Sequence, residues 1–151
     1  MMNGYYRRPK LTAEAEWYDA NGKRFIRSGD YGRFDEDGFL ILMDRKKDMI
    51  ISGGFNIYPS DLEAVLARND AVAETAVVGV PSERWGETPV AFVVVKTGRE
   101  ERADDLREWV NSKVGKTQRL AALELVPSLP RSAIGKILKR ELRERYIRDN
   151  G

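Results

Sequence analysis

A run of charged residues, Asp44-Arg45-Lys46-Lys47-Asp48, separates two apolar, strand-like stretches of this 151-residue chain. Charged side chains are almost never fully buried unless they are paired, so such a run does not suit the interior of one compact domain. It suits the connection between two bodies. The sequence therefore predicts a first unit over residues 1–44 and a second over residues 45–151, within a length that fits one domain plus part of another.

The first unit is predicted to contain one β-hairpin. Residues 1–27 are polar, rich in turn formers and only weakly periodic, with a tight turn at Asp19-Ala20-Asn21-Gly22. The hairpin then joins Tyr31–Phe34 to Phe39–Met43 through Asp35-Glu36-Asp37-Gly38, a typical turn sequence.

The second unit is predicted to be a small α+β domain, with helices covering a short mixed sheet. A capping box, Ser60-Asp61-Leu62-Glu63, marks the start of its first helix. A loop over Pro81–Thr88 separates two β-branched strands. The expected strands are Met49–Ser52, Phe55–Tyr58, Ala73–Val80, Pro89–Lys96 and Leu123–Val126, and the later helices are Ala103–Val114 and Lys136–Ile147.

The composition excludes several kinds of chemistry. The chain contains no cysteine and no histidine, which removes thiolate nucleophiles, Ser–His pairs and the commonest metal ligands, so no metal site is expected. With 26 basic and 24 acidic residues, the net charge of +2 is too small to indicate a nucleic acid partner or an anionic membrane. No stretch is apolar enough for a membrane span or a signal peptide, so a cytoplasmic location is expected.

Lys136 is the first candidate for a functional residue. It ends the turn Pro130-Arg131-Ser132-Ala133-Ile134-Gly135-Lys136, and no hydroxyl residue follows it. A Walker A loop needs that hydroxyl and an earlier glycine, so this turn is not one. Two interpretations remain. The lysine starts a helix, or it sits on a mobile loop that brings an ammonium group to a phosphate and neutralises charge in the transition state.

The other candidates also allow two interpretations each. Asp30 could stabilise a turn, or it could accept hydrogen bonds from the hydroxyl groups of a ribose, with Arg45 beside it as a donor. Gly53-Gly54 could form a simple hairpin turn, free to adopt positive φ, or it could let a ligand chain pass close to the backbone. Trp85 could pack against the edge of the sheet or form a platform for a ligand.

Five linked segments together resemble the C-terminal part of an adenylate-forming (AMP-binding) enzyme. The resemblance is greatest to the acyl-CoA synthetases, which are fatty-acyl and aryl-CoA ligases, and it runs from about residue 3 to about residue 146. The segments are Asn3-Gly4-Tyr5-Tyr6-Arg7-Arg8-Pro9, Ser28-Gly29-Asp30, Asp44–Glu63, Val78-Gly79-Val80-Pro81 with Arg84-Trp85-Gly86-Glu87, and Pro130–Leu142. Their common order and spacing make them far more specific than any one of them alone.

The resemblance implies a two-step ligase. A carboxylate first attacks the α-phosphate of Mg-ATP, and a thiol, usually that of CoA, then takes the acyl group. A small lid domain swings between the two steps. The site residues that the resemblance implies are Lys136 for catalysis of adenylation, Asp30 and Arg45 for the ribose, Lys47 as the hinge, and Gly53, Gly54 and Trp85 for the CoA channel.

The resemblance also implies a division of labour. Residues 1–44 would be the tail of a large N-terminal adenylation domain, and residues 45–151 the mobile C-terminal lid domain. The family's phosphate-binding loop, its magnesium-side acidic residue and its acid pocket belong to that large domain. We therefore expect this chain to be a fragment whose partner is the missing domain. Alone, it is expected to bind none of ATP, Mg²⁺ or CoA tightly and to be inactive.

Several positions depart from the family pattern, among them Tyr31 after Asp30. Phe55 stands where a charged residue often follows the glycine pair. The segment Gly115-Lys116-Thr117-Gln118-Arg119-Leu120 stands in place of a common Lys-x-Pro sequence, so no contact to the CoA nucleotide is assigned to Lys116–Arg119.

Two other functions stay open at this stage. An amino-acid-activating domain of a peptide synthetase shares the first half-reaction, but such domains usually carry a Lys-Ile-Arg-Gly-like segment where this chain has Ile50-Ile51-Ser52-Gly53-Gly54. A non-catalytic nucleic-acid or interaction module would fit the size and the basic final helix. It would need exposed aromatic residues on a sheet face, and the predicted strands contain few.

Overall fold

The computed structural model describes residues 4–151 and divides the chain into two units. The first unit ends at Lys46, and the second runs from Lys47 to Gly151. This division lies two residues beyond the predicted boundary and still inside the charged run. Residues 1–3, which include Asn3 of the first family-like segment, lie outside the described residues.

The first unit opens with a short helix and a short hairpin. These elements are α1 (Pro9–Ala15), β1 (Glu16–Tyr18) and β2 (Arg24–Ile26). The weak periodicity of this region did not predict α1, because none of its residues is buried. Between the strands, Asp19 Oδ1 accepts hydrogen bonds from the N–H groups of Asn21 and Lys23, both at 2.9 Å. The tight turn predicted there is confirmed.

The predicted hairpin of the first unit is confirmed as β3 (Asp30–Phe34) and β4 (Leu40–Arg45), which pair antiparallel. Asp35 stabilises its turn, because its Oδ1 accepts hydrogen bonds from the N–H groups of Asp37 at 3.1 Å and Phe39 at 2.8 Å.

The second unit is built on a five-stranded sheet with the order β6-β5-β8-β7, in which β9 also pairs with β8. Every pair is antiparallel except β8 with β9, so the sheet is mixed, as predicted. The strands are β5 (Ile50–Ser52), β6 (Phe55–Ile57), β7 (Val72–Ser82), β8 (Gly86–Val95) and β9 (Ala122–Leu125). The helices are α2 (Pro59–Leu66), α3 (Ala103–Asn111), the 3₁₀-helix η1 (Lys116–Gln118) and α4 (Lys139–Asn150).

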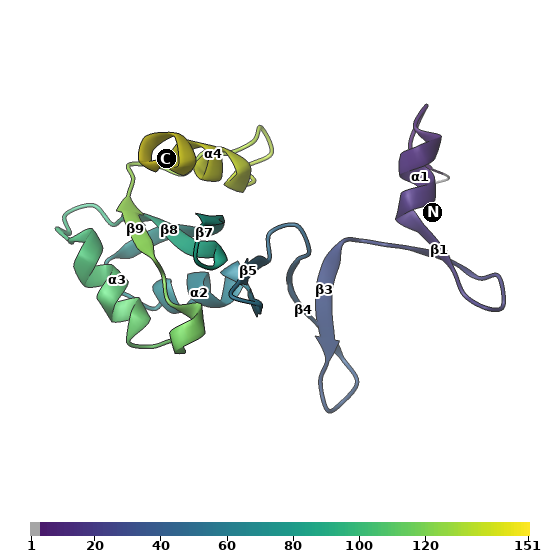
Figure 1. Ribbon diagram of the computed structural model, residues 1–151, viewed down its shortest axis with the longest axis horizontal. Coiled ribbons are helices and arrows are strands. Elements are labelled where there is room, and N and C mark those ends of the chain that lie inside the picture. Colours follow the sequence, from purple (N-terminus) through teal and green to yellow (C-terminus); the bar gives the residue numbers. More distant parts are fainter. Residues whose placement is uncertain (1–3) are drawn as a thin grey trace. The chain divides into compact units, whose positions relative to one another are not determined.

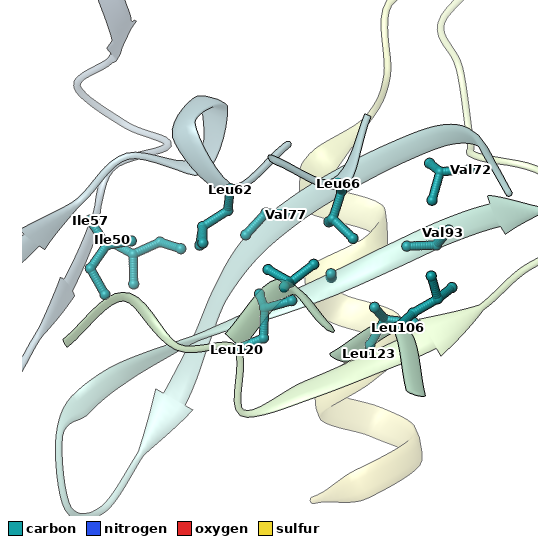
Figure 2. Packing of buried hydrophobic residues seen from close by; sticks show 12 residues of the cluster. Ile50, Ile57, Leu62, Leu66, Val72, Val77, Val93, Leu106, Leu120 and Leu123 are labelled. Atoms are coloured by element: carbon teal, nitrogen blue, oxygen red, sulfur yellow. The ribbon is translucent and has the colours of Figure 1, made fainter. Parts of the chain in front are cut away.

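Helices cover both faces of this sheet (Figure 1). Successive side chains of a strand point to opposite faces, and along β7 they enter two separate apolar clusters. Val77 packs in one cluster with Leu62 of α2 and Leu106 of α3 (Figure 2). Val78 packs in the other with Leu142 of α4. The unit therefore has three layers, with α2 and α3 on one side and α4 on the other, which confirms the predicted α+β domain.

The first helix of this unit does not begin as predicted. It starts at Pro59, and no side chain caps its N-terminus with a hydrogen bond, so the predicted capping box is wrong. Glu63 has a different role. Its Oε1 accepts a hydrogen bond from the N–H of Val77 at 2.8 Å, on the edge strand β7. A contact across fourteen residues of sequence outcompetes the local one.

Two other boundaries also differ. Strands β7 and β8 pair as far as Ser82 and Gly86, so most of the predicted loop Pro81–Thr88 is strand. Helix α4 begins at Lys139 instead of Lys136. Within residues 4–151, no helix is both long and apolar enough to cross a membrane.

We expect Leu142→Ala to lower the free energy of unfolding by about 2–5 kcal/mol, because the side chain is only 2% exposed and its loss leaves a cavity between α4 and the sheet. Urea unfolding followed by circular dichroism measures the change. Arg140→Ala, on the exposed side of α4, is the matched control and should change it by less than about 0.5 kcal/mol. Equal effects of the two variants would contradict the packing of α4.

Candidate functional site

Asp30 and Arg45 lie opposite each other on β3 and β4. They form an ion pair, with Arg45 Nε 3.5 Å from Asp30 Oδ1, and their side chains keep 50% (Arg45) and 30% (Asp30) of their surface exposed. An exposed pair of this kind adds at most about 1 kcal/mol to stability. The structure thus brings together the two residues that were predicted to bind a ribose. Asp30 supplies a carboxylate that accepts hydrogen bonds, and Arg45 supplies a guanidinium that donates them.

The predicted hinge residue follows this pair in the sequence. Backbone hydrogen bonding holds the β3–β4 hairpin as far as Lys46, whose N–H donates to the carbonyl of Gly29 at 2.8 Å. Lys47 comes next, exposed and in a turn, as the first residue of the second unit. A hinge at Lys47 would therefore act where one unit ends and the next begins.

The predicted CoA-channel glycines form the turn between β5 and β6. Gly53 has a φ of 55° and Gly54 a φ of 83°, so both use the conformational freedom predicted for them. The indole of Trp85 lies directly against Gly53, since a Cβ added there would be 2.9 Å from Trp85 Cε3. The N–H of Gly53 also donates to the carbonyl of Trp85 at 2.8 Å. The structure therefore brings the glycine pair and Trp85 together.

Trp85 lies at the tip of the β7–β8 hairpin and packs on the glycine turn, yet 48% of its surface is exposed. The guanidinium of Arg84 lies 4.6 Å from the centre of its ring, a cation–π distance. Both interpretations of Trp85 therefore fit the geometry. The ring supports the turn, and its exposed surface is available to a ligand.

The side chain of Glu87 connects strand β5, which leads into the glycine turn, to helix α4. Its Oε2 accepts a hydrogen bond from the N–H of Ile51 at 3.1 Å, on the strand that leads into the glycine pair. Its Oε1 accepts one from Arg143 Nη2 of α4 at 3.0 Å. The sequence does not indicate this role of Glu87, because Arg143 lies 56 residues away and no local pattern links the two.

Lys136 lies on a tight turn that precedes α4, so the interpretation of this residue as a helix start is wrong. Residues Arg131 and Ile137 form an isolated antiparallel bridge that closes the turn. Inside it, the N–H of Ser132 donates to the carbonyl of Lys136 at 2.8 Å, and the N–H of Lys136 donates to Ser132 Oγ at 3.2 Å. Gly135 has a φ of 79°, which explains the glycine before the lysine.

The side chain of Lys136 is exposed, and within residues 4–151 it forms no ion pair with a carboxylate. Its neighbours along the chain do. Arg131 pairs with Glu74 of β7 at 2.8 Å, and Lys139 pairs with Glu63 of α2 at 2.7 Å. The Lys136 ammonium is therefore available to an external anion, while the residues on either side of it are attached to the domain.

The Lys136 turn and the glycine turn are attached at different positions along β7. Arg131 attaches the first to Glu74, near the start of β7, whereas Trp85 follows Ser82, at its end. Because a strand rises about 3.3 Å per residue, positions 74 and 82 are roughly 26 Å apart. The two groups of candidate residues are therefore attached toward opposite ends of β7.

The segment that departs from the family pattern is well ordered by contacts. Helix η1 lies beside β6, the strand that follows the glycine pair. The amide of Asn111 holds the end of the segment, since Nδ2 donates to the carbonyl of Leu120 at 3.0 Å and Oδ1 accepts from its N–H at 2.7 Å.

Among the described residues, no cluster of three or more acidic side chains could hold a metal ion, so residues 4–151 do not fit a Mg²⁺ site.

We expect the two glycines to respond differently to alanine. Gly54→Ala should cost about 1 kcal/mol of stability, because only its backbone conformation resists a side chain and no described atom beyond its chain neighbours lies within 4 Å of the added Cβ. Gly53→Ala should cost about 1–3 kcal/mol more, since the new methyl group overlaps the indole of Trp85. Urea unfolding gives both values, and a shift of the tryptophan fluorescence should accompany only Gly53→Ala. Equal costs would contradict the contact.

Comparison with known proteins identifies the family. Residues 61–136 match the family model of the AMP-binding enzyme C-terminal domain. The 2-succinylbenzoate–CoA ligase of Geobacillus kaustophilus is 44% identical over 140 residues, which are 93% of this chain and 28% of that protein. The long-chain-fatty-acid–CoA ligase of Bacillus subtilis is 41% identical over 144 residues, which are 95% of this chain and 25% of that protein.

Comparison with solved structures supports the same family. The crystal structure of ATP-bound MatB from Rhodopseudomonas palustris is similar with a TM-score of 0.84 and 34% identity, over 95% of this chain and 28% of that one. The chain thus spans about a quarter of the length of the relatives that it matches. These relatives support the predicted acyl-CoA synthetase family over the peptide-synthetase and nucleic-acid alternatives. Since the family model covers half of the sequence, the chain belongs to the family of AMP-binding enzyme C-terminal domains.

Proposed function

We propose that this chain acts as the mobile C-terminal part of an ATP-dependent carboxylic acid–CoA ligase. The observation that carries the proposal is the exposed Lys136 ammonium on a turn whose flanking residues are fixed to the domain. The names of the relatives, both CoA ligases, support the same reaction class. The acid, CoA and a large partner domain are parts of this proposal.

In the first half-reaction, a carboxylate oxygen attacks the α-phosphorus of ATP and pyrophosphate leaves. Lys136 would lie between the carboxylate and the α-phosphate, where its fixed positive charge offsets the negative charge that the two anions bring together. Asp30 would accept hydrogen bonds from the ribose hydroxyls, and Arg45 would donate to the ribose. No step is assigned to Mg²⁺ here, because the described residues do not fit a metal site.

In the second half-reaction, the thiol sulfur attacks the acyl carbon and AMP leaves. Gly53, Gly54 and Trp85 would line the path of the thiol, where the absence of side chains on the glycines allows a narrow ligand to pass close to the backbone. The attachment of the Lys136 turn near one end of β7 and of the glycine turn near the other supports a swing of the unit about Lys47 between the half-reactions.

We expect Lys136→Ala to reduce adenylation in the complete ligase by at least about 100-fold, because it removes a charge that stabilises the transition state. Thioester formation from supplied acyl-adenylate should change far less. Pyrophosphate release measures the first half-reaction, and thioester yield measures the second. Lys96→Ala, at another exposed lysine, is the matched control and should leave both rates unchanged. Equal losses in both half-reactions would contradict the role of Lys136.

We also expect the purified 151-residue chain to show no ATP–pyrophosphate exchange and no tight binding of ATP or CoA. The described residues supply an ammonium, the pair predicted to bind the ribose and a glycine turn. They contain no cluster of acidic side chains that could hold a metal ion beside the phosphates. An isotope-exchange assay tests this directly. Exchange activity that scales with the concentration of the purified chain would overturn the division of labour proposed here.

A further inference from the structure

The turn that carries Lys136 has little to stabilise it from within. Its internal hydrogen bonds join Ser132, Gly135 and Lys136, and these bonds lie in an exposed part of the chain. The side chain at its tip, Ile134, is 87% exposed and adds no apolar packing. Short, exposed turns of this kind open readily. The Arg131–Ile137 bridge closes the turn but does not attach it to the sheet, so the position of Lys136 relative to the sheet depends on side-chain contacts between the turn and the rest of the domain.

We propose that Arg131 is a positioning residue that fixes the Lys136 turn to strand β7. Its Nη1 donates a hydrogen bond to the carbonyl of Gly135 at 2.7 Å, one residue before Lys136. Its Nη2 donates to Glu74 Oε2 on β7 at 2.8 Å. A guanidinium is planar and holds its donors in a rigid fork. The two bonds therefore set the distance between the backbone at Gly135 and the sheet.

A second contact holds the other side of the turn. Lys139 Nζ lies 2.7 Å from Glu63 Oε1, and the same oxygen accepts the N–H of Val77 at 2.8 Å. Lys136 thus lies between two attachments, one at Glu74 and one at the level of Val77, both on β7. Of the two attachments, that of Arg131 is closer to Lys136, because Arg131 bonds to the carbonyl of Gly135 whereas Lys139 already belongs to α4. For this reason Arg131 is the residue that positions the turn.

A displacement of the Lys136 turn should slow adenylation, an expectation that rests on the proposed function. A catalytic group displaced by about 1 Å can lose about 100-fold in rate. Arg131 is not assigned a contact to any substrate. Its effect should therefore appear only in the half-reaction that uses Lys136, and it should appear together with a measurable loosening of the turn.

The first experiment uses the 151-residue chain and requires no activity. Amide hydrogen exchange, measured by NMR, should be about 10-fold faster at Ser132 and Gly135 in Arg131→Gln than in the unchanged chain, since a hydrogen bond from a charged group is lost. Arg131→Lys, which keeps the charge but replaces the rigid fork by a flexible ammonium, should give a smaller increase. Arg140→Gln removes an exposed ion pair on α4 and should leave the turn unchanged. Core amides of β7 and β8 report that every variant is folded.

The second experiment uses the complete ligase. Arg131→Gln should lower the rate of adenylation by about 10-fold to 100-fold and change thioester formation from supplied acyl-adenylate by less than about 2-fold. Glu74→Gln, which neutralises the anchor but keeps the contact to Gly135, should give a smaller loss in the same half-reaction.

The outcomes distinguish the attachment of the turn from its effect on adenylation. Unchanged exchange of the turn in Arg131→Gln would overturn the attachment. Faster exchange with an unchanged rate of adenylation would overturn the positioning role and leave the attachment intact. If Lys136→Ala itself left adenylation unchanged, the proposed function would be wrong, while the exchange result would still test the attachment.

Discussion

The pairing of β7 with β8 is the interaction on which the second unit depends. It runs from Val72 with Val95 to Ser82 with Gly86, and successive residues of β7 are buried on both faces. This two-sided burial requires a helical layer on each side, and α2, α3 and α4 provide them. The same strand carries Glu74 near one end and leads into Trp85 at the other. A single rigid element therefore positions both groups of candidate residues.

Much of this architecture could be predicted from the sequence. β-branched runs identified β7 and β8, because that signal arises from burial, and helices were also expected close to α2, α3 and α4. The element ends were less predictable. The Ser60–Glu63 segment matches a capping box, yet Glu63 bonds to Val77, and the turn around Trp85 was expected to be a longer loop. In the first case a contact between distant residues overrides the local pattern, and in the second the strand pairing continues almost to the turn.

The candidate site likewise combines residues that the sequence predicts with supporting residues that it does not. Residue types and their spacing indicated Lys136, Asp30, Arg45 and the glycine pair, since chemistry restricts which residues can occupy such positions. The supporting residues were not indicated. Arg131 and Glu74 are 57 residues apart, and Glu87 and Arg143 are 56 apart, so only the folded chain brings them together. The ligand roles of the site residues, like the cytoplasmic location, stay predictions.

The central claim is that Lys136 and the glycine pair reach the same adenylate in turn, by a swing at Lys47. These 151 residues contain no cysteine, so they add no background when a spin label is placed at one position, such as Ala133→Cys. The direct measurement is the distance from this label to a second one beside the nucleotide site of the large domain, determined by electron paramagnetic resonance. We predict a short distance with ATP and acid bound and a distance longer by at least about 15 Å with adenylate and CoA bound. The same distance in both states would contradict the account.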